Sequence, residues 1–327
     1  MSTTWTDDSE LGAGYAQTTF DLGRDPDGEG EIAAVLVRAD PPERVRGAVL
    51  YVHGFTDYFF QTGVADFFTA RGYAFYGLDL RKCGRARRPG QTAHYVSDLS
   101  LYDAELDRAL GVVRAETGAP VVLMGHSTGG LILPLWLSRL AGRPGGVDQA
   151  GIAGLVLNSP WFDLQGAPWM RTIGTQAIRA IAKVRPLDVM KLPPGGTYGS
   201  SLAASEHGEW TYNLAFKPVD GFPVTYGWLN AVRRGQSALH RGLDVGVPSL
   251  VLRSNRTWFS RAFGPPAATA DTVLDVKQIA RWSGCLGNHT WVVPVDDAMH
   301  DVFLSREAVR DQAYSVVDVW LKDRALL

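Results

Sequence analysis

The segment that decides the fold is Pro120-Val121-Val122-Leu123-Met124-Gly125-His126-Ser127-Thr128-Gly129-Gly130, which an apolar run, Leu131–Leu140, follows. Its apolar beginning predicts a buried strand and Leu131–Leu140 predicts a helix, so the glycine-rich residues between them must form a sharp turn. Gly125 and Gly129 permit this turn because residues without a Cβ tolerate strained backbone and close approach of neighbouring segments. A G-x-S-x-G pattern in this context predicts that Ser127 stands at the end of a strand, beside a helix N-terminus that favours developing negative charge.

On both sides of this segment, short apolar runs bounded by Gly, Pro or Asp alternate with helical patterns. The predicted strands are Ile32–Val37, Ala48–Val52, Tyr73–Leu80, Pro120–Met124, Ala153–Asn158, Val247–Arg253 and Thr290–Val295. The predicted helices are Val64–Ala70, Leu101–Glu116, Leu131–Leu140, Val276–Trp282 and Arg306–Leu321. Near-continuous apolar strands that alternate with helices are typical of a mostly parallel sheet covered by helices on both faces, so we predict an α/β fold.

One stretch, residues 161–242, departs from this alternation. It contains a helical patch at Ile173–Val184 and Gly- and Pro-rich segments, but no convincing strand. About eighty residues between two core strands is far more than a simple crossover requires. We therefore predict that residues 1–160 and 243–327 form one core and that residues 161–242 form an inserted helical cap. The alternative is a helical linker without a role in the site.

The composition excludes several classes of function. The 327 residues are 46% hydrophobic and 20% charged, as in a globular chain with a large core. Lys+Arg 32 against Asp+Glu 34 leaves a net charge of −2, without the basic excess that nucleic-acid binding requires. The two cysteines and the scattered histidines show no metal-ligand spacing, so we expect neither a metal nor a cofactor.

The same sequence also bears on membrane attachment and location. No stretch reaches the ~18 apolar residues of a membrane span, and the N-terminal residues show no export signal. We therefore expect a cytoplasmic protein with at most peripheral membrane contact. The oligomeric state is left open.

Ser127 needs a base, because a serine hydroxyl becomes a strong nucleophile only when a positioned group takes its proton. Of the seven histidines, His300 follows the last predicted strand by a short loop, at the sheet edge where α/β sites gather. The acid that orients His300 is expected after Val247–Arg253, where Asp271 and Asp275 are the first carboxylates; the residues alone leave both open. The carboxylates near His300 in sequence are expected in solvent: Asp296, Asp297 and Asp301.

Five segments resemble α/β-hydrolases, and in particular the monoacylglycerol lipase, lysophospholipase and serine aminopeptidase-like branch. They are His53-Gly54-Phe55, Asp79-Leu80-Arg81 with Gly84, Gly125–Gly129, Asp271–Asp275 and Met299-His300-Asp301. They occur in the family's order along nearly the whole chain. Arg81-Lys82-Cys83-Gly84-Arg85 departs from the family's usual turn and Thr128 stands where Met is more frequent, which weakens any transfer of substrate.

The resemblance implies an α/β-hydrolase fold with a catalytic triad: Ser127 as nucleophile, His300 as base and Asp271 as acid. It places Asp275 in or at the start of the helix Val276–Trp282 instead of in the triad. It also implies an oxyanion hole, since two backbone N–H groups must face the tetrahedral oxygen, and these are the amides of Phe55 and Thr128.

Aromatic residues in two loops beside these motifs are expected to line an apolar pocket that suits an acyl chain. They are Tyr58, Phe59 and Phe60 after one strand, and Trp161 and Phe162 after another; Trp228 of the predicted cap is a further candidate. Packing in the core or cap is the alternative role for these rings.

The leading hypothesis is a serine hydrolase that cleaves carboxylic esters of apolar or lipid-like acyl substrates, of the monoacylglycerol or lysophospholipid type, through an acyl-enzyme. Acyl transfer or thioester hydrolysis with the same triad is the nearest alternative. A proline iminopeptidase-like peptidase is another, although no acidic cluster that could bind an α-amino group is evident. A non-catalytic binding protein on this fold is the third, and loss of a triad residue would favour it.

Overall fold

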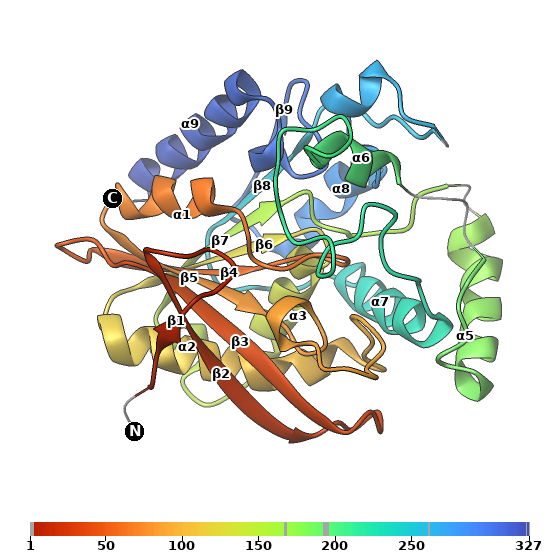
Figure 1. The fold of residues 1–327 in the computed structure, drawn as a ribbon, viewed down its shortest axis with the longest axis horizontal. Helices are drawn as coiled ribbons and strands as arrows, with labels where there is room; N and C mark the ends of the chain where they lie inside the picture. The colour runs from red at the N-terminus through yellow and green to blue at the C-terminus, as the bar shows by residue number, and fades with distance from the viewer. Residues whose placement is uncertain (1–2, 167–168, 192–195, 261, 325, 327) are drawn as a thin grey trace.

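A nine-stranded sheet forms the centre of the molecule, with the strand order β1-β2-β3-β5-β4-β6-β7-β8-β9 (Figure 1). The computed structural model describes residues 3–166, 169–191, 196–260, 262–324 and 326. The strands are β1 (Thr6–Asp7), β2 (Tyr15–Arg24), β3 (Glu31–Ala39), β4 (Gly47–Val52), β5 (Tyr73–Asp79), β6 (Val121–His126), β7 (Ile152–Asn158), β8 (Ser249–Ser254) and β9 (Thr290–Val295). Strands β4 to β9 run parallel, and β1, β2 and β3 extend one edge in antiparallel register.

Helices cover both faces of this sheet. Helices α1 (Thr62–Thr69) and α9 (Glu307–Asp323) lie on one face, and α2 (Asp103–Thr117) and α3 (Gly129–Ala141) lie on the other (Figure 1). The remaining α-helices are α4 (Gly146–Ala150), α5 (Thr175–Val184), α6 (Thr197–Leu202), α7 (Tyr226–Leu239) and α8 (Val276–Trp282). Every residue of β4, β5 and β6 is buried, which explains why these strands form continuous apolar runs in the sequence.

The predicted α/β fold is confirmed, and every predicted strand and helix occurs within two residues of its expected ends. Strand β2 is not among the predicted strands, because it is mostly half-buried and only its Phe20 is fully buried, so its alternation is weak. Helix α7 was not predicted either. Glycines and arginines interrupt the apolar pattern of that helix, and one of them, Arg233, is itself buried.

Residues 161–242 lie between β7 and β8, which are neighbours in the sheet. The described residues of this segment contain α5, α6 and α7 and, apart from isolated bridges such as Val189 with Thr225, no strand. Helix α7 is anchored in the main core by Trp228, Val232 and Leu239, whereas only Ile178 of α5 is buried. Helix α5 accordingly lies at the periphery of the molecule (Figure 1).

Candidate active site

Ser127 lies in a strained turn between β6 and α3. Its φ of 51° is in the left-handed region, which costs a residue with a Cβ about 1–2 kcal/mol. The Ser127 N–H donates to the Asn158 carbonyl at 2.9 Å, and the Ser127 carbonyl accepts from Trp161 N–H at 3.0 Å. These bonds to the chain after β7 hold the turn in a conformation that it would not adopt alone.

The two glycines of the G-x-S-x-G pattern are required by close backbone contacts. A Cβ on Gly125 would lie 2.8 Å from the carbonyl carbon of Gly129. A Cβ on Gly129 would lie 2.6 Å from the carbonyl oxygen of His53. The pattern therefore brings β6, α3 and the chain after β4 together at Ser127.

His300 lies between the two other residues of the predicted triad. Its Nε2 is 3.0 Å from Ser127 Oγ, and its Nδ1 is 2.9 Å from Asp271 Oδ2. The exposed fractions are 8% for Ser127, 2% for His300 and 0% for Asp271. An Nδ1–H held by the carboxylate leaves Nε2 free to accept the hydroxyl proton, which is the arrangement that activates a serine.

The two candidate acids have different surroundings. The second oxygen of Asp271, Oδ1, accepts hydrogen bonds from Val273 N–H at 2.8 Å and Leu274 N–H at 2.7 Å, so this buried carboxylate is well satisfied. Asp275 is the N-cap of α8, and its Oδ1 accepts from Lys277 N–H at 3.0 Å. The structure thus brings Asp271 to His300 and uses Asp275 to begin a helix.

The chain after β4 reaches Ser127 at Gly54, where an added Cβ would lie 2.9 Å from Ser127 Cβ. His53 holds this loop: its Nδ1–H donates to the Gly54 carbonyl at 2.7 Å, and its Nε2 accepts from Leu80 N–H at 3.1 Å. Burial lowers the pKa of His53, so the ring is neutral; one ring nitrogen can then donate a hydrogen bond while the other accepts one. Within the part of the chain that the structure describes, the amides of Phe55 and Thr128 donate no hydrogen bond, and both residues line the cavity at Ser127.

A cavity of about 660 Å³ opens at Ser127 and is lined mainly by apolar side chains. The core contributes Phe55, His126, Ser127, Thr128, Val273, Leu274 and His300. The 161–242 segment contributes, among others, Trp161, Leu164, Trp169, Ile178, Ile181, Tyr226, Trp228 and Leu229. Trp161 and Trp228 thus lie where the sequence analysis expected them.

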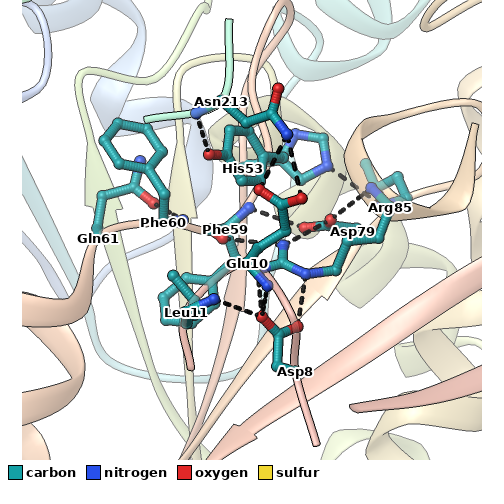
Figure 2. Close-up of polar contacts among 12 residues, drawn as sticks. Asp8, Glu10, Leu11, His53, Phe59, Phe60, Gln61, Asp79, Arg85 and Asn213 are labelled. Atoms are coloured by element: carbon teal, nitrogen blue, oxygen red, sulfur yellow. Dashed lines mark hydrogen bonds and ion pairs between the residues drawn. The ribbon is translucent and has the colours of Figure 1, made fainter. Parts of the chain in front are cut away.

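Tyr58 and Phe59 do not line this cavity, so their predicted place in it is wrong. The Phe59 ring packs against Tyr51 and Phe75 at centroid distances of 5.8 and 5.3 Å, inside the core. The Phe59 N–H donates to Asp79 Oδ1 at 2.7 Å, and the buried Asp79 carboxylate is paired with Arg85 (Figure 2). Buried Tyr58 accepts a hydrogen bond from Asn213 N–H through its hydroxyl oxygen at 2.8 Å, and neither Phe60 nor Phe162 lines the cavity.

The expectation for Asp301 is also wrong, because this residue is buried. Its Oδ1 accepts from Asn158 Nδ2 at 2.6 Å and from Phe303 N–H at 3.0 Å. Asp296 and Asp297 are exposed, as expected.

The sequence analysis missed a buried ion pair beside the candidate site. Lys217 Nζ lies 3.0 Å from Asp57 Oδ1, and Asp57 Oδ2 lies 3.3 Å from His126 Nδ1. Burial raises the pKa of Asp57, but the charge of Lys217 and the hydrogen bond with His126 outweigh it and hold this pKa well below its ordinary value. No local pattern marks this pair, since its members are separated by 160 residues.

Two further properties concern the described residues as a set. Among them, no group of three or more His, Cys, Asp or Glu side chains could hold a metal ion. Among them too, no helix has the length and apolar character that crossing a membrane demands.

The fold is shared with several solved structures of low sequence identity. The monoglyceride lipase of Saccharomyces cerevisiae, solved as a soluble variant with a substrate analogue, is 15% identical with a TM-score of 0.60, over 99% of this chain and 95% of that chain. The monoacylglycerol lipase of Paleococcus ferrophilus is 18% identical with a TM-score of 0.62, over 88% and 99%. A carboxyl esterase of Bacillus coagulans, in complex with glycerol, is 14% identical with a TM-score of 0.62, over 94% and 98%.

A search of the curated proteins gives no match to the sequence. The profile of the family described as "Serine aminopeptidase, S33" matches residues 43–257, which is more than half of the chain. The matched region includes β4, the strained turn at Ser127 and most of the parallel sheet, in agreement with the predicted resemblance. The chain therefore belongs to the serine aminopeptidase S33 family of α/β-hydrolases.

Proposed function

We propose that this α/β-hydrolase cleaves carboxylic esters with an apolar acyl chain, through a serine-bound acyl-enzyme. The observation that carries the proposal is the chain of contacts from Asp271 through His300 to Ser127, which ends at a cavity lined mainly by apolar groups. We place the chemistry in residues 1–160 and 243–327, and we assign residues 161–242 the role of a cap over the acyl chain.

Each step follows from these positions. Ser127 Oγ attacks the ester carbonyl carbon while His300 Nε2 takes its proton, and Asp271 stabilises the resulting imidazolium. The amides of Phe55 and Thr128 donate hydrogen bonds to the tetrahedral oxyanion. His300 then returns the proton to the leaving alcohol. A water molecule, activated by His300 in the same way, releases the acid and restores Ser127.

The lining of the cavity supports an uncharged, apolar acyl group over a peptide. Its described lining residues include no Asp or Glu, and a free α-amino group in an apolar site would need such a partner. The cavity volume is in the range of small-molecule sites. Monoacylglycerol- or lysophospholipid-type esters are the substrates that we propose, and two lipases named for monoglycerides share the fold.

Acyl transfer and thioester hydrolysis use the same groups and differ only in the acceptor or the leaving group. A purely binding role would leave the contact of His300 with Ser127 without a purpose. Ester hydrolysis is therefore our conclusion. The test below distinguishes whether water or an alcohol accepts the acyl group.

We further propose that α5 and its neighbours contact a lipid surface with anionic head groups. The strongly exposed apolar side chains of this region are Trp169 (61%), Ile173 (71%), Leu187 (45%), Val184 (77%) and Val189 (54%). Exposed basic side chains accompany them: Arg179, Lys183 and Lys191. An amphipathic helix with apolar and basic groups binds anionic lipid. Trp169 also lines the cavity, so a substrate could pass from that surface towards Ser127.

The test of the proposed chemistry is labelling by a fluorophosphonate together with turnover of a p-nitrophenyl ester series. We expect the wild type to label and to hydrolyse esters, and Ser127→Ala to do neither. Ser315→Ala, which changes an exposed serine of α9, is the matched control and should behave as the wild type. A wild type that neither labels nor turns over any ester would refute the proposal, whereas faster acyl release with added alcohol would identify a transferase.

A further inference from the structure

Three residues of the 161–242 segment hydrogen-bond three consecutive core residues directly after Phe55. Asn213 N–H donates to Tyr58 Oη at 2.8 Å, and Phe222 N–H donates to Thr56 Oγ1 at 2.9 Å. Between them, Lys217 Nζ donates to Asp57 Oδ1 at 3.0 Å and to the Thr56 carbonyl at 3.3 Å. Figure 2 shows the Asn213 end of this set, where Asn213 Nδ2 also donates to Glu10 at 2.9 Å.

The centre of this set is a nearly buried ion pair, and its lysine also lines the cavity at Ser127. Lys217 is 4% exposed and Asp57 is 1% exposed. A charge left alone at such a depth is strongly destabilising, so the two groups depend on each other. The 161–242 segment is therefore joined to the core by a contact that is strong only in one geometry.

The core end of this contact is the strained part of the loop after β4. Thr56 has a φ of 51°, a conformation that a threonine keeps only when its surroundings hold it there. Both the carbonyl and the hydroxyl of Thr56 accept hydrogen bonds from the 161–242 segment. The preceding residue is Phe55, which lines the cavity and whose amide donates no hydrogen bond within the described chain. Holding Thr56 therefore restrains the part of the loop that bears this amide.

The same ion pair also reaches the residue before Ser127. Asp57 Oδ2 lies 3.3 Å from His126 Nδ1, and the His126 ring lies 4.9 Å from the His300 ring. One carboxylate thus connects the loop that bears Phe55, the turn that bears Ser127 and the ammonium group of Lys217.

We propose that Lys217 is a positioning residue for catalysis: it holds Thr56 and Asp57 so that the Phe55 amide meets the oxyanion beside Ser127. The 161–242 segment then not only covers the acyl chain but also completes the catalytic geometry from outside the core. This inference rests on the proposed function, because it assigns Lys217 a part in that reaction.

The experiment compares kcat and KM of Lys217→Met with those of the wild type on one short, water-soluble ester. Met keeps the length of the side chain without its charge, and we expect kcat to fall about tenfold to a hundredfold while KM changes much less. Lys217→Arg retains the charge and should recover part of kcat. Lys277→Met, at an exposed lysine of α8 outside the site and the proposed lipid surface, is the matched control and should keep the wild-type kcat.

The double variant Lys217→Met/Asp57→Asn separates positioning from simple charge burial. It leaves no unpaired buried charge, so it should fold better than Lys217→Met and lose less kcat, yet remain about tenfold below the wild type. It also carries the test if Lys217→Met does not fold. Wild-type kcat in either variant, or a loss that appears in KM alone, would overturn the proposal.

The failure of this inference can be distinguished from failure of the proposed function. If the wild type hydrolyses no ester and takes no fluorophosphonate, the proposed function fails and the inference falls with it. If the wild type is active and either variant keeps its kcat, only the role of Lys217 is refuted.

Discussion

The two walls of the cavity at Ser127 are built in different ways. On the core wall, Ser127, His300 and Asp271 are nearly inaccessible and each is held by hydrogen bonds from separate strands or loops. On the opposite wall, α5 has one buried residue, Ile178, and its Val184 side chain is 77% exposed. Reacting groups need a fixed geometry, whereas an acyl chain needs only apolar surface of suitable shape. Under the proposed function, the core would determine the reaction and α5 would determine which acyl chain fits.

Part of the 161–242 segment does not follow this contrast between a fixed core wall and a loosely held opposite wall. Helix α7 is anchored in the core, and Lys217, between α6 and α7, is as buried as the groups of the core wall. A division into a rigid core and a loose cover therefore applies to α5 but not to the entire segment.

The largest effect should come from the acid of the core wall. Asp271→Asn removes the charge that orients His300 and stabilises its cation, so we expect kcat to fall by about 10⁴-fold. Asp275→Asn is the matched control, because Asn is as good an N-cap for α8 and kcat should stay near that of the wild type. The measurement is steady-state hydrolysis of a short ester. A severe loss in Asp275→Asn with a mild one in Asp271→Asn would contradict the assignment.

A smaller and more selective effect is expected on the opposite wall. Ile178→Trp adds volume inside the cavity, so kcat/KM for a ten-carbon acyl ester should fall about 10- to 100-fold, while that for a four-carbon ester changes little. Ile173→Trp, at a side chain that is 71% exposed, is the control. Kinetics over a chain-length series provide the measurement. Equal losses on both chain lengths would mean that this wall also supports the chemistry.

The outer side of α5 should affect lipid binding by a few-fold only. Lys183→Gln removes one exposed basic group, and binding to vesicles that contain anionic lipid should fall about fivefold, with little change on neutral vesicles. Lys277→Gln, at an exposed lysine of α8 in the core, should bind as the wild type does. Co-flotation with vesicles measures the binding of both variants. If Lys183→Gln and Lys277→Gln bound anionic vesicles equally well, α5 would have no special role at a lipid surface.

The smallest effect concerns the pH dependence of stability. Burial lowers the pKa of His94 well below its usual value and lowers that of His240 as well. The unfolded chain then binds a proton more readily than the native protein does, so native stability falls as pH decreases from about 7 to 5.

Variants of these two histidines compare the core with the 161–242 segment. His94 packs against Phe55 behind the core wall, at a ring distance of 4.9 Å, and His240 ends α7. Loss of His94 in His94→Phe should reduce the decrease in Tm between pH 7 and 5 by about 2–4 °C, and His240→Phe should reduce it less. Differential scanning calorimetry at the two pH values measures this. A larger effect of His240→Phe than of His94→Phe would contradict this prediction, because it would make His240 the histidine with the more strongly lowered pKa.

Much of the fold could be predicted because its signals are local. The continuous apolar runs of β4, β5 and β6 and the strand–turn–helix pattern at Ser127 depend on residues that are close in sequence. Strand β2 and helix α7 could not be predicted: β2 is mostly half-buried, and the buried face of α7 includes the polar residues Arg233 and Gln236. The misplacement of Phe59 has a related reason: an aromatic residue after a strand has the same local pattern whether it faces a cavity or the core.

By itself, the sequence determined the α/β class, the strained turn at Ser127 and the order in which serine, acid and histidine occur. These features follow from residue periodicity, from glycines without a Cβ and from the direction of parallel strands. Only the tertiary structure decided which aromatic rings line the cavity and that Lys217 is buried against Asp57. The ion pair joins residues 160 positions apart, and it arises only when packing brings distant surfaces together and removes water from between them.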